Sequence, residues 1–297
     1  MSQDEAGHQG PIPLPKRCYR PGASLSVVGF GGLALVGMDR EPANRLVAGS
    51  VESGVDYFDV APSYGDGEAE DKLGMALASR RRKVFLAGKT LLRSTAGVRL
   101  ELEQSLRRLR TSYLDLYQFH AVNKAADAEE LLAPGGAAEF LLRAREQGLI
   151  RFIGFSSHSV PISLALLDRF RFDSILFPVN FVCYARGNFG PQVLAKARSS
   201  GTACVALKSL ALTVLPRSEP RCYPNCWYRP IDDPVLALQA MRFSLSEDVT
   251  ALLPPADERL YDLAVKLARA ATPLTDEERS RLIAQAQGLK PILSTSK

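Results

Sequence analysis

The sequence contains no uninterrupted apolar run of about 18 residues, the length typical of a membrane-spanning helix. Its first ten residues are polar and acidic, and they lack the basic and apolar regions of a signal peptide. We therefore expect no membrane partner and a cytoplasmic location. Histidine is also scarce, at three in 297 residues, so a histidine at the end of a buried strand would be a specific candidate for chemistry.

A large excess of one charge is absent as well. The formal net charge is +5, with 46% hydrophobic and 23% charged residues, which is ordinary for a globular protein. Basic residues gather only at positions 80–83 and 107–110, and no aromatic residues are interleaved with them. This pattern favours solvated helix ends, so we expect a small-molecule partner rather than a nucleic acid.

Cysteines are few and odd in number, which argues against a disulfide framework. Cys183 and Cys204 lie in apolar runs and are expected to be core residues. Cys222 and Cys226 are separated by three residues in a proline-rich segment. This spacing without a second pair favours a loop without a metal, and it leaves a labile disulfide or a metal site as the less favoured alternatives.

Short apolar runs alternate with amphipathic segments along most of the chain. The runs are nearly continuous in hydrophobic residues, as strands buried on both faces are. Strands are predicted at residues 25–29, 56–60, 83–88, 114–119, 151–156, 174–181, 202–208 and 249–254, and helices at 42–53, 68–80, 96–110, 137–147, 160–170, 191–200, 234–246 and 257–270. This alternation predicts an α/β fold, a single-domain parallel (β/α)8 TIM barrel.

The chain is somewhat longer than the usual ~250 residues of such a barrel, which leaves room for extensions. We expect a flexible N-terminal extension at residues 1–20 and one barrel domain at 21–297. A capping signature predicts a C-terminal helix at 275–287. Long loops at 121–136 and 211–231 follow two predicted strands, so both fall at the C-terminal face, where barrel enzymes carry their sites.

Polar residues stand at or just beyond the ends of three neighbouring predicted strands. Asp59 ends one strand and Tyr64 follows five residues later, while Lys89 and His120 follow the next two strands. A phenol can protonate a carbonyl oxygen, an ammonium lowers the phenol's pKa, a carboxylate holds the ammonium, and an imidazole orients the oxygen. The four residues therefore suit the reduction of a carbonyl group.

The order and local contexts of these residues resemble the aldo-keto reductase family, over about residues 20–271. The segments GVDYFDVAPSYG at 54–65 and GLIRFIGFSS at 148–157 carry the resemblance. It implies a nicotinamide-dependent carbonyl (aldehyde or ketone) reductase or alcohol dehydrogenase that works through an Asp-Tyr-Lys-His tetrad. The tetrad would be Asp59, Tyr64, Lys89 and His120, and the substrate a small carbonyl compound or alcohol.

The segment GFGGLA at residues 29–34 fits the dinucleotide fingerprint of Rossmann domains and follows a predicted strand. A Rossmann domain needs a helix to open at the glycines, whereas the helical pattern here begins near residue 42. Eight βα units also exceed the six strands of that fold, so the barrel is favoured. The resemblance implies instead that Gly31, Gly32 and Leu33 line the site beneath the substrate and nicotinamide.

The resemblance also implies where the rest of the cofactor would bind. Ser156 and Ser157 match a Ser-Asn pair that holds the carboxamide in the family. The family's sixth strand offers a glutamine to the same group, and Asn180 could substitute for it here. Leu207 replaces a stacking aromatic residue, so it can pack against the ring without an aromatic quadrupole. The remaining implied contacts are Lys208, which could reach the pyrophosphate, and Ser209.

The end of the last predicted strand bears on the choice of cofactor. In the family, members that prefer NADPH carry basic residues there, but this chain has Asp257 and Glu258, followed by Arg259. Two interpretations stay open: a carboxylate that repels a 2′-phosphate, or acidic residues that cap the next helix. The expected cofactor is NADPH, with NADH as the alternative.

Two classes of function remain after these observations. The favoured one is a nicotinamide-dependent carbonyl reductase. The alternative is a regulatory barrel that binds the nucleotide with little or no turnover, since a fold alone does not determine activity. The altered nicotinamide contacts favour the alternative, and the complete tetrad favours the enzyme.

Overall fold

The computed structural model describes residues 13–295, and a parallel barrel is its central element. The eight strands of the barrel form one sheet, with each strand beside the next along the chain. Backbone hydrogen bonds of 2.8 Å close it, from Gly29 N to Leu252 O and from Leu252 N to Val27 O. The predicted (β/α)8 barrel is confirmed. Its strands are β3 (Phe30–Gly31), β4 (Tyr57–Asp59), β5 (Phe85–Thr90), β6 (Leu114–Phe119), β7 (Ile150–Ser156), β8 (Ser174–Pro178), β9 (Ala203–Leu207) and β12 (Ala251–Leu253).

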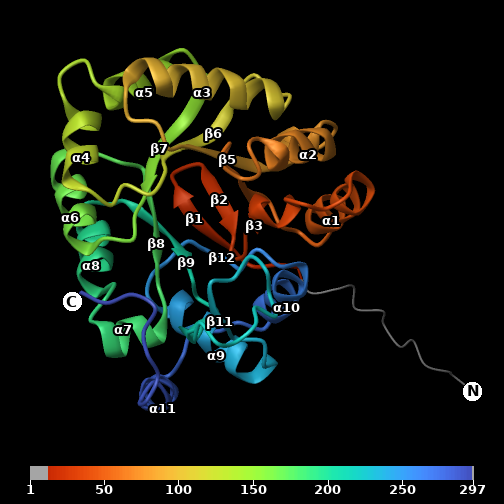
Figure 1. Ribbon diagram of the computed structural model, residues 1–297, viewed down its shortest axis with the longest axis vertical. Coiled ribbons are helices and arrows are strands. Elements are labelled where there is room, and N and C mark those ends of the chain that lie inside the picture. Colours follow the sequence, from red (N-terminus) through yellow and green to blue (C-terminus); the bar gives the residue numbers. More distant parts are fainter. Residues whose placement is uncertain (1–12, 296–297) are drawn as a thin grey trace, which may run out of the picture.

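Helices surround the strands, as Figure 1 shows. Side-chain oxygens of Ser94, Ser159 and Asp233 accept from backbone N–H groups and so begin three of these helices. The predicted helices are all present, with ends that differ by a few residues. They are α1 (Arg40–Glu52), α2 (Glu68–Leu77), α3 (Thr95–Arg108), α5 (Ala137–Glu146), α6 (Val160–Arg169), α8 (Pro191–Ser199), α9 (Pro234–Ser246) and α10 (Glu258–Ala268).

The N-terminal part of the structure differs from the prediction. The strand expected at residues 25–29 overlaps β2 (Ala23–Ser26), which pairs antiparallel with β1 (Lys16–Arg20), whereas the first barrel strand is β3. Residues 16–20 are therefore a strand rather than a flexible extension. The rest of that expected extension, residues 1–12, lies outside the described residues.

The β1–β2 hairpin fills one end of the barrel. Figure 1 shows it (red) at the centre of the ring of strands. Tyr19 is buried, its hydroxyl donates to Ser174 Oγ at 2.8 Å, and its ring meets Phe85 and Phe152 edge-on. Because these contacts occupy the interior, the hairpin extends the barrel core at the amino-terminal ends of the strands.

Both long loops contain secondary structure that the sequence pattern did not reveal. The 121–136 loop holds α4 (Ala125–Leu132), and the 211–231 loop holds an antiparallel hairpin of β10 (Ala211–Val214) and β11 (Tyr228–Pro230). The strand predicted at 174–181 is too long. After β8 ends at Pro178, the chain enters α7 (Phe181–Gly187), which Asn180 caps.

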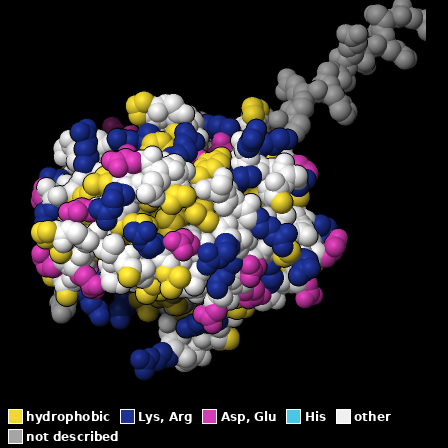
Figure 2. Space-filling view, turned by 90° about the horizontal axis from the view of Figure 1, so that it is seen from above, with side chains coloured by type: hydrophobic (Ala, Val, Ile, Leu, Met, Phe, Trp, Pro, Cys, Tyr) yellow, Lys and Arg dark blue, Asp and Glu magenta, His cyan; other side chains and the backbone are white. Residues whose placement is uncertain are grey.

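The surface and the C-terminal tail follow the sequence analysis more closely. The tail helix α11 (Asp276–Gln285) begins with the predicted capping box, formed by Thr275 and Glu278. Within residues 13–295, no helix has the length and apolar character needed to cross a bilayer. On the face seen in Figure 2, Lys and Arg side chains are interspersed with Asp and Glu side chains.

Candidate active site

Asp59 and Lys89 form a buried ion pair at the carboxyl ends of β4 and β5. They are 2% and 1% exposed, and Lys89 Nζ donates to Asp59 Oδ1. Gln118 Nε2 and the Tyr57 hydroxyl donate to Oδ2 at 3.0 and 3.2 Å. Burial by itself would lower the pKa of Lys89, but Asp59 and Tyr64 outweigh it, so this pKa is raised. Lys89 stays charged because Asp59 is its buried counter-ion.

Tyr64 lies next to this pair, with Lys89 Nζ 4.9 Å from the centre of its ring. Three successive residues with positive φ, Gly65, Asp66 and Gly67, turn the chain back into α2 immediately after it. Burial raises the pKa of the Tyr64 phenol more than Lys89 lowers it. The expected effect of the ammonium is present, but the net shift is upward, so the phenol is protonated at neutral pH and can donate.

His120 completes the group at the end of β6. Its ring centre is 5.9 Å from that of Tyr64, and the ring planes are at 86°. Burial, assisted by the charges of Lys89, His158 and Arg93, lowers the pKa of His120 to about 3. Its Nδ1 is buried and has no hydrogen-bond partner among residues 13–295. A neutral imidazole with an unused nitrogen can form a hydrogen bond with a substrate oxygen.

Beyond His120, Lys208 and His158 add two further basic groups. Lys208 Nζ lies 5.0 Å from the centre of the Tyr228 ring, and no ion pair joins it to a carboxylate within the described part of the chain. Burial lowers its pKa, and burial together with the Lys208 charge lowers the pKa of His158 to about 4. Ser209 Oγ is also buried without a partner among the described residues. These unused donors fit an anionic part of a nucleotide.

Ser156 and Ser157, at the end of β7, hold the loop that follows β6. Ser156 Oγ accepts from Ala121 N at 2.8 Å, and Ser157 Oγ lies 3.2 Å from Asn123 Oδ1. Asn123, which the sequence did not single out, also accepts from His158 N at 2.6 Å. Ser156 uses its acceptor in this contact, which leaves its O–H to donate to a ligand such as a carboxamide.

Asn180 has a structural role that differs from the implied carboxamide contact. Its Oδ1 accepts from Val182 N and Cys183 N, both at 2.9 Å, and its Nδ2 donates to Lys208 O at 3.0 Å and to Ala211 O. These four bonds use the full capacity of the amide. Asn180 therefore caps α7 and holds the start of the 211–231 loop, and no donor is left for a cofactor.

Arg259 is likewise engaged within the protein. Its guanidinium pairs with Asp257 at 3.0 Å, donates to Cys222 O at 3.1 Å and lies 4.4 Å from the centre of the Tyr223 ring. Asp257 also caps α10 through the backbone N–H of Arg259. The helix-cap interpretation of Asp257 is thus confirmed, and Asp257 also pairs with Arg259, the basic residue beside it.

The glycines at the first strand end form a short turn, not the helix of a Rossmann domain. Gly31 ends β3, and residues Gly32–Leu35, which include Leu33, form a single 3-10 turn. A Cβ added to Gly32 would lie 2.8 Å from Val60 Cγ2, so the turn packs tightly against β4. Leu207 ends β9 and is partly exposed, as an apolar contact for a planar ring would be. The Rossmann alternative is wrong.

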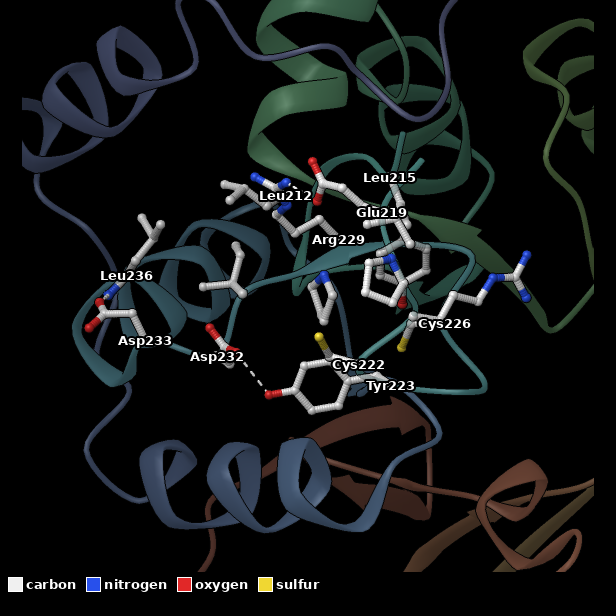
Figure 3. Close-up of a pocket in the computed structure, with 15 residues that line it drawn as sticks. Leu212, Leu215, Glu219, Cys222, Tyr223, Cys226, Arg229, Asp232, Asp233 and Leu236 are labelled. Carbon is white, nitrogen blue, oxygen red and sulfur yellow. Dashed lines mark hydrogen bonds and ion pairs between the residues drawn. The ribbon is translucent and has the colours of Figure 1, made fainter. Parts of the chain in front are cut away.

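A cavity of about 330 Å³ lies away from the tetrad, beneath the 211–231 loop. Figure 3 shows its lining of Leu212, Leu215, Tyr223 and Leu236, with Cys222 and Cys226 beside it. Both cysteines are free thiols, Cys222 exposed and Cys226 buried, and burial raises the pKa of Cys226 to about 11. In residues 13–295 no cluster of three or more His, Cys, Asp or Glu side chains could hold a metal ion.

Three contacts of the site were missed in the sequence. Gln118 could have been found, because it lies two residues before His120 in a buried strand and so faces the same side of the sheet. The same alternation places Tyr57 on the side of Asp59. Asn123 carries no comparable signal, because its position is set by the conformation of a loop.

Comparison with known proteins identifies the family. The family model described as "Aldo/keto reductase family" matches residues 27–226, which is more than half of the chain. The chain belongs to the aldo/keto reductase family. Members of this family are NAD(P)H-dependent oxidoreductases that act on carbonyl groups. The resemblance inferred from the tetrad is therefore confirmed at the level of the family.

Individual relatives agree with this assignment. "Aldo-keto reductase YhdN" of Bacillus subtilis (strain 168) is 32% identical over 148 residues, which cover 46% of this chain and 43% of the relative, so the match spans less than half of that protein. The aldo-keto reductase AKR11C1 from Bacillus halodurans, in its holo form, has a TM-score of 0.72 at 25% identity and covers 92% of this chain and 95% of its own.

A further solved structure bears on the cofactor of the family. The aldo/keto reductase from Klebsiella pneumoniae, in complex with NADP and acetate, has a TM-score of 0.66 and covers 92% of this chain and 96% of its own. At 20% identity it shows the shared barrel fold. NADP is thus the cofactor found with that neighbour.

Proposed function

We propose that this protein reduces a small aldehyde or ketone with a nicotinamide cofactor, or oxidises the corresponding alcohol, through Asp59, Tyr64, Lys89 and His120. The observation that supports it most directly is the convergence of a protonated phenol, a charged ammonium–carboxylate pair and a neutral imidazole at one end of the barrel. The raised pKa values of Tyr64 and Lys89 and the lowered pKa of His120 support these roles.

Each of the four side chains has a separate role in this proposal. When bound, the cofactor supplies the hydride that becomes attached to the carbonyl carbon. Tyr64 gives its phenolic proton to the carbonyl oxygen, and Lys89 stabilises the phenolate that remains. Asp59 keeps Lys89 charged and in place, and His120 forms a hydrogen bond with the same oxygen. One proton from solvent then restores Tyr64, which balances the reaction.

The residues around the tetrad fit a dinucleotide better at its nicotinamide and pyrophosphate than at a 2′-phosphate. Ser156 retains a donor for the carboxamide, Leu207 offers an apolar surface, and Lys208 with Ser209 offers unpaired donors for the pyrophosphate. Arg259 is already neutralised by Asp257. We therefore infer that either NADPH or NADH serves as cofactor, without a large preference.

The replacement Tyr64→Phe tests the proposal. It removes the proton donor and keeps the ring, so kcat for 4-nitrobenzaldehyde or methylglyoxal should fall by about 100-fold or more, with little change in nucleotide Kd. Absorbance of the reduced nicotinamide reports turnover, and Tyr113→Phe, remote from the tetrad beside Arg81, is the matched control. Full turnover in Tyr64→Phe would exclude this phenol as the acid.

The same measurements address the regulatory alternative. One observation favours it, since Asn180 has no donor left for the carboxamide. A protein of that class would bind NADPH or NADH, seen as quenching of Trp227 fluorescence, without oxidising it in the presence of any carbonyl compound tested. Turnover that depends on Tyr64 would exclude the alternative.

A further inference from the structure

Arg93 contacts three segments around the candidate site. It lies in the loop between β5 and α3, and its side chain is 11% exposed. Nη2 donates to His120 O at 2.7 Å and to Ala121 O at 3.4 Å, and Nη1 donates to Thr90 O at 3.4 Å. Nε and Nη2 both reach Asp127 Oδ2, on α4, at 3.2 Å. One guanidinium thus joins the ends of β5 and β6 to α4.

The backbone that Arg93 contacts is strained. Ala121 has a φ of +52°, in the left-handed region that a residue with a Cβ occupies only when its surroundings hold it there. On one side, Ser156 holds the turn through Ala121 N and Val122 N, both at 2.8 Å. On the other side, Arg93 spans the carbonyls of His120 and Ala121, so the turn is fixed from both directions.

No hydrogen bond within residues 13–295 orients the His120 side chain. Its Nδ1 has no partner in the described residues, and its ring contact is the edge-on one with Tyr64. The direction of the imidazole therefore depends on the backbone conformation at residues 120 and 121. A shift of about 1 Å in a group that orients a reacting atom can cost as much as 100-fold in rate.

We propose that Arg93 is a positioning residue, which fixes the left-handed turn at Ala121 and so aims the His120 imidazole at the substrate oxygen. The proposal rests on the carbonyl reduction proposed above. It requires an arginine, because a guanidinium presents several donors in one plane and can contact both carbonyls and a carboxylate together, whereas an ammonium is a single point charge. Asp127 holds the guanidinium in its orientation.

Two substitutions of Arg93 separate geometry from charge. Arg93→Met removes both, and we expect kcat for 4-nitrobenzaldehyde to fall about 10- to 100-fold while nucleotide Kd stays within about twofold. Arg93→Lys keeps the charge without the planar set of donors, so it should recover only part of this loss. Asp127→Asn should lower kcat in the same direction by a smaller factor.

Arg169→Met is the matched control. Arg169 forms an ion pair with Glu129, which also lies on α4, but it does not contact the backbone at residues 120 and 121. Its removal therefore loosens α4 without touching the turn, and kcat should remain within about twofold. A loss equal to that of Arg93→Met would show that Arg93 acts only by holding α4, and would overturn the proposal.

The NMR signals of the imidazole give a readout that needs no turnover. The chain has three histidines, so the His120 ring signals can be assigned with His120→Asn and His158→Asn variants. We expect Arg93→Met to shift them, because the ring moves relative to Tyr64, and Arg169→Met to leave them in place. Unchanged His120 signals in Arg93→Met would overturn the positioning role, and so would full activity in Arg93→Lys.

The two proposals fail in different ways. If Tyr64→Phe retains full turnover while Arg93→Met shifts the His120 signals, the acid assignment is wrong and the effect of Arg93 on the ring stands. If Tyr64→Phe is inactive and Arg93→Met is fully active, the reaction stands and the positioning role is wrong. Circular dichroism and thermal unfolding identify any variant that fails to fold, in which case Arg93→Lys and Asp127→Asn decide.

Discussion

Burial affects the titratable residues of this site in different ways because their partners differ. Lys89 has Asp59 within hydrogen-bond reach, so its charged form is stabilised and its pKa is raised in spite of burial. Burial lowers the pKa of His120 to about 3, and the charges of Lys89, His158 and Arg93 act in the same direction. The same end of the barrel thus holds a charged ammonium and a neutral imidazole, both next to Tyr64.

The neutral histidines predict a loss of stability in mild acid. The pKa values of His120 and His158 are about 3 and about 4, below their ordinary value of 6.5. At pH values between the pKa of a histidine in the folded chain and its pKa in the unfolded chain, the unfolded chain binds a proton that the folded chain does not. The unfolding free energy therefore decreases as the pH falls through 6.5. At pH 5 each histidine should cost about 2 kcal/mol of unfolding free energy relative to pH 7.5.

Urea unfolding at pH 7.5, 6 and 5 measures this dependence. The double variant His120→Gln, His158→Gln is the matched control. Because glutamine does not titrate, most of the dependence of the unfolding free energy on pH should disappear in this variant. Ordinary Asp and Glu side chains are already charged above pH 5. Burial raises the pKa of Glu70, which adds stability as the pH falls and so opposes the histidine effect, and the double variant retains this contribution. A wild-type stability that stays level over this range would contradict neutral histidines in the folded protein.

At the scale of elements, Asn180 shows how a polar residue can be placed for a fold rather than for a ligand. Replacement by alanine would remove the side chain that bonds two N–H groups of α7 and the carbonyls of Lys208 and Ala211. We expect Asn180→Ala to lower the unfolding free energy by at least about 2 kcal/mol. Chemical denaturation measures it, with Ser94→Ala as the control.

The control has a clear expected size. Ser94 caps α3 because its Oγ accepts one exposed hydrogen bond of 3.2 Å from Gly97 N. Its replacement should cost about 1 kcal/mol or less. An equal cost for Asn180→Ala and Ser94→Ala would show that the Asn180 contacts contribute no more than an ordinary helix cap.

The connection between α10 and the 211–231 loop predicts the cofactor preference. Arg259 joins Asp257 to Cys222 O and the Tyr223 ring, so a 2′-phosphate would have to compete for it. We expect NADPH to be preferred over NADH by about tenfold or less in the wild type, equivalent to about 1.4 kcal/mol. Asp257→Arg should shift the preference toward NADPH, because it removes a repulsion and adds a phosphate partner.

Fluorescence titration of both nucleotides at one ionic strength measures these preferences. Asp257→Asn is the matched control, since asparagine keeps the cap of α10 and removes only the charge. It should shift the preference in the same direction by a smaller factor. A wild-type preference of about a thousandfold for NADPH would show that another residue holds the phosphate and that Asp257 only caps the helix.

At the scale of the whole molecule, closure of the barrel brings the first and last strands of its sheet together. Val27 and Gly29 bond to Leu252, and the β1–β2 hairpin fills the barrel end nearby. The tail is attached through Arg242, whose guanidinium donates to Glu278 of α11 at 2.7 and 2.8 Å. We propose on these grounds that the barrel and the tail helix behave as one domain.

The sequence by itself determined the barrel and the positions of the four polar residues of the proposed tetrad. Nearly continuous apolar runs predict strands buried on both faces, and their regular alternation with amphipathic segments leaves the closed parallel sheet as the arrangement that buries them. Asp59, Lys89 and His120 follow from the same pattern, because parallel strands that end in polar residues place them at a common edge. These features depend on local periodicity, which a sequence displays directly.

Only the tertiary structure decided which polar groups are free for a ligand. Asn180 and Arg259 have side chains suited to a cofactor, but contacts with α7 and with Asp257 occupy them. Arg93 stands in an unremarkable loop segment, and folding brings it to the backbone of His120, 27 positions away in sequence. Hydrogen-bond partners between loops depend on three-dimensional distance and burial, and neither has a period along the chain that could be read from the residues.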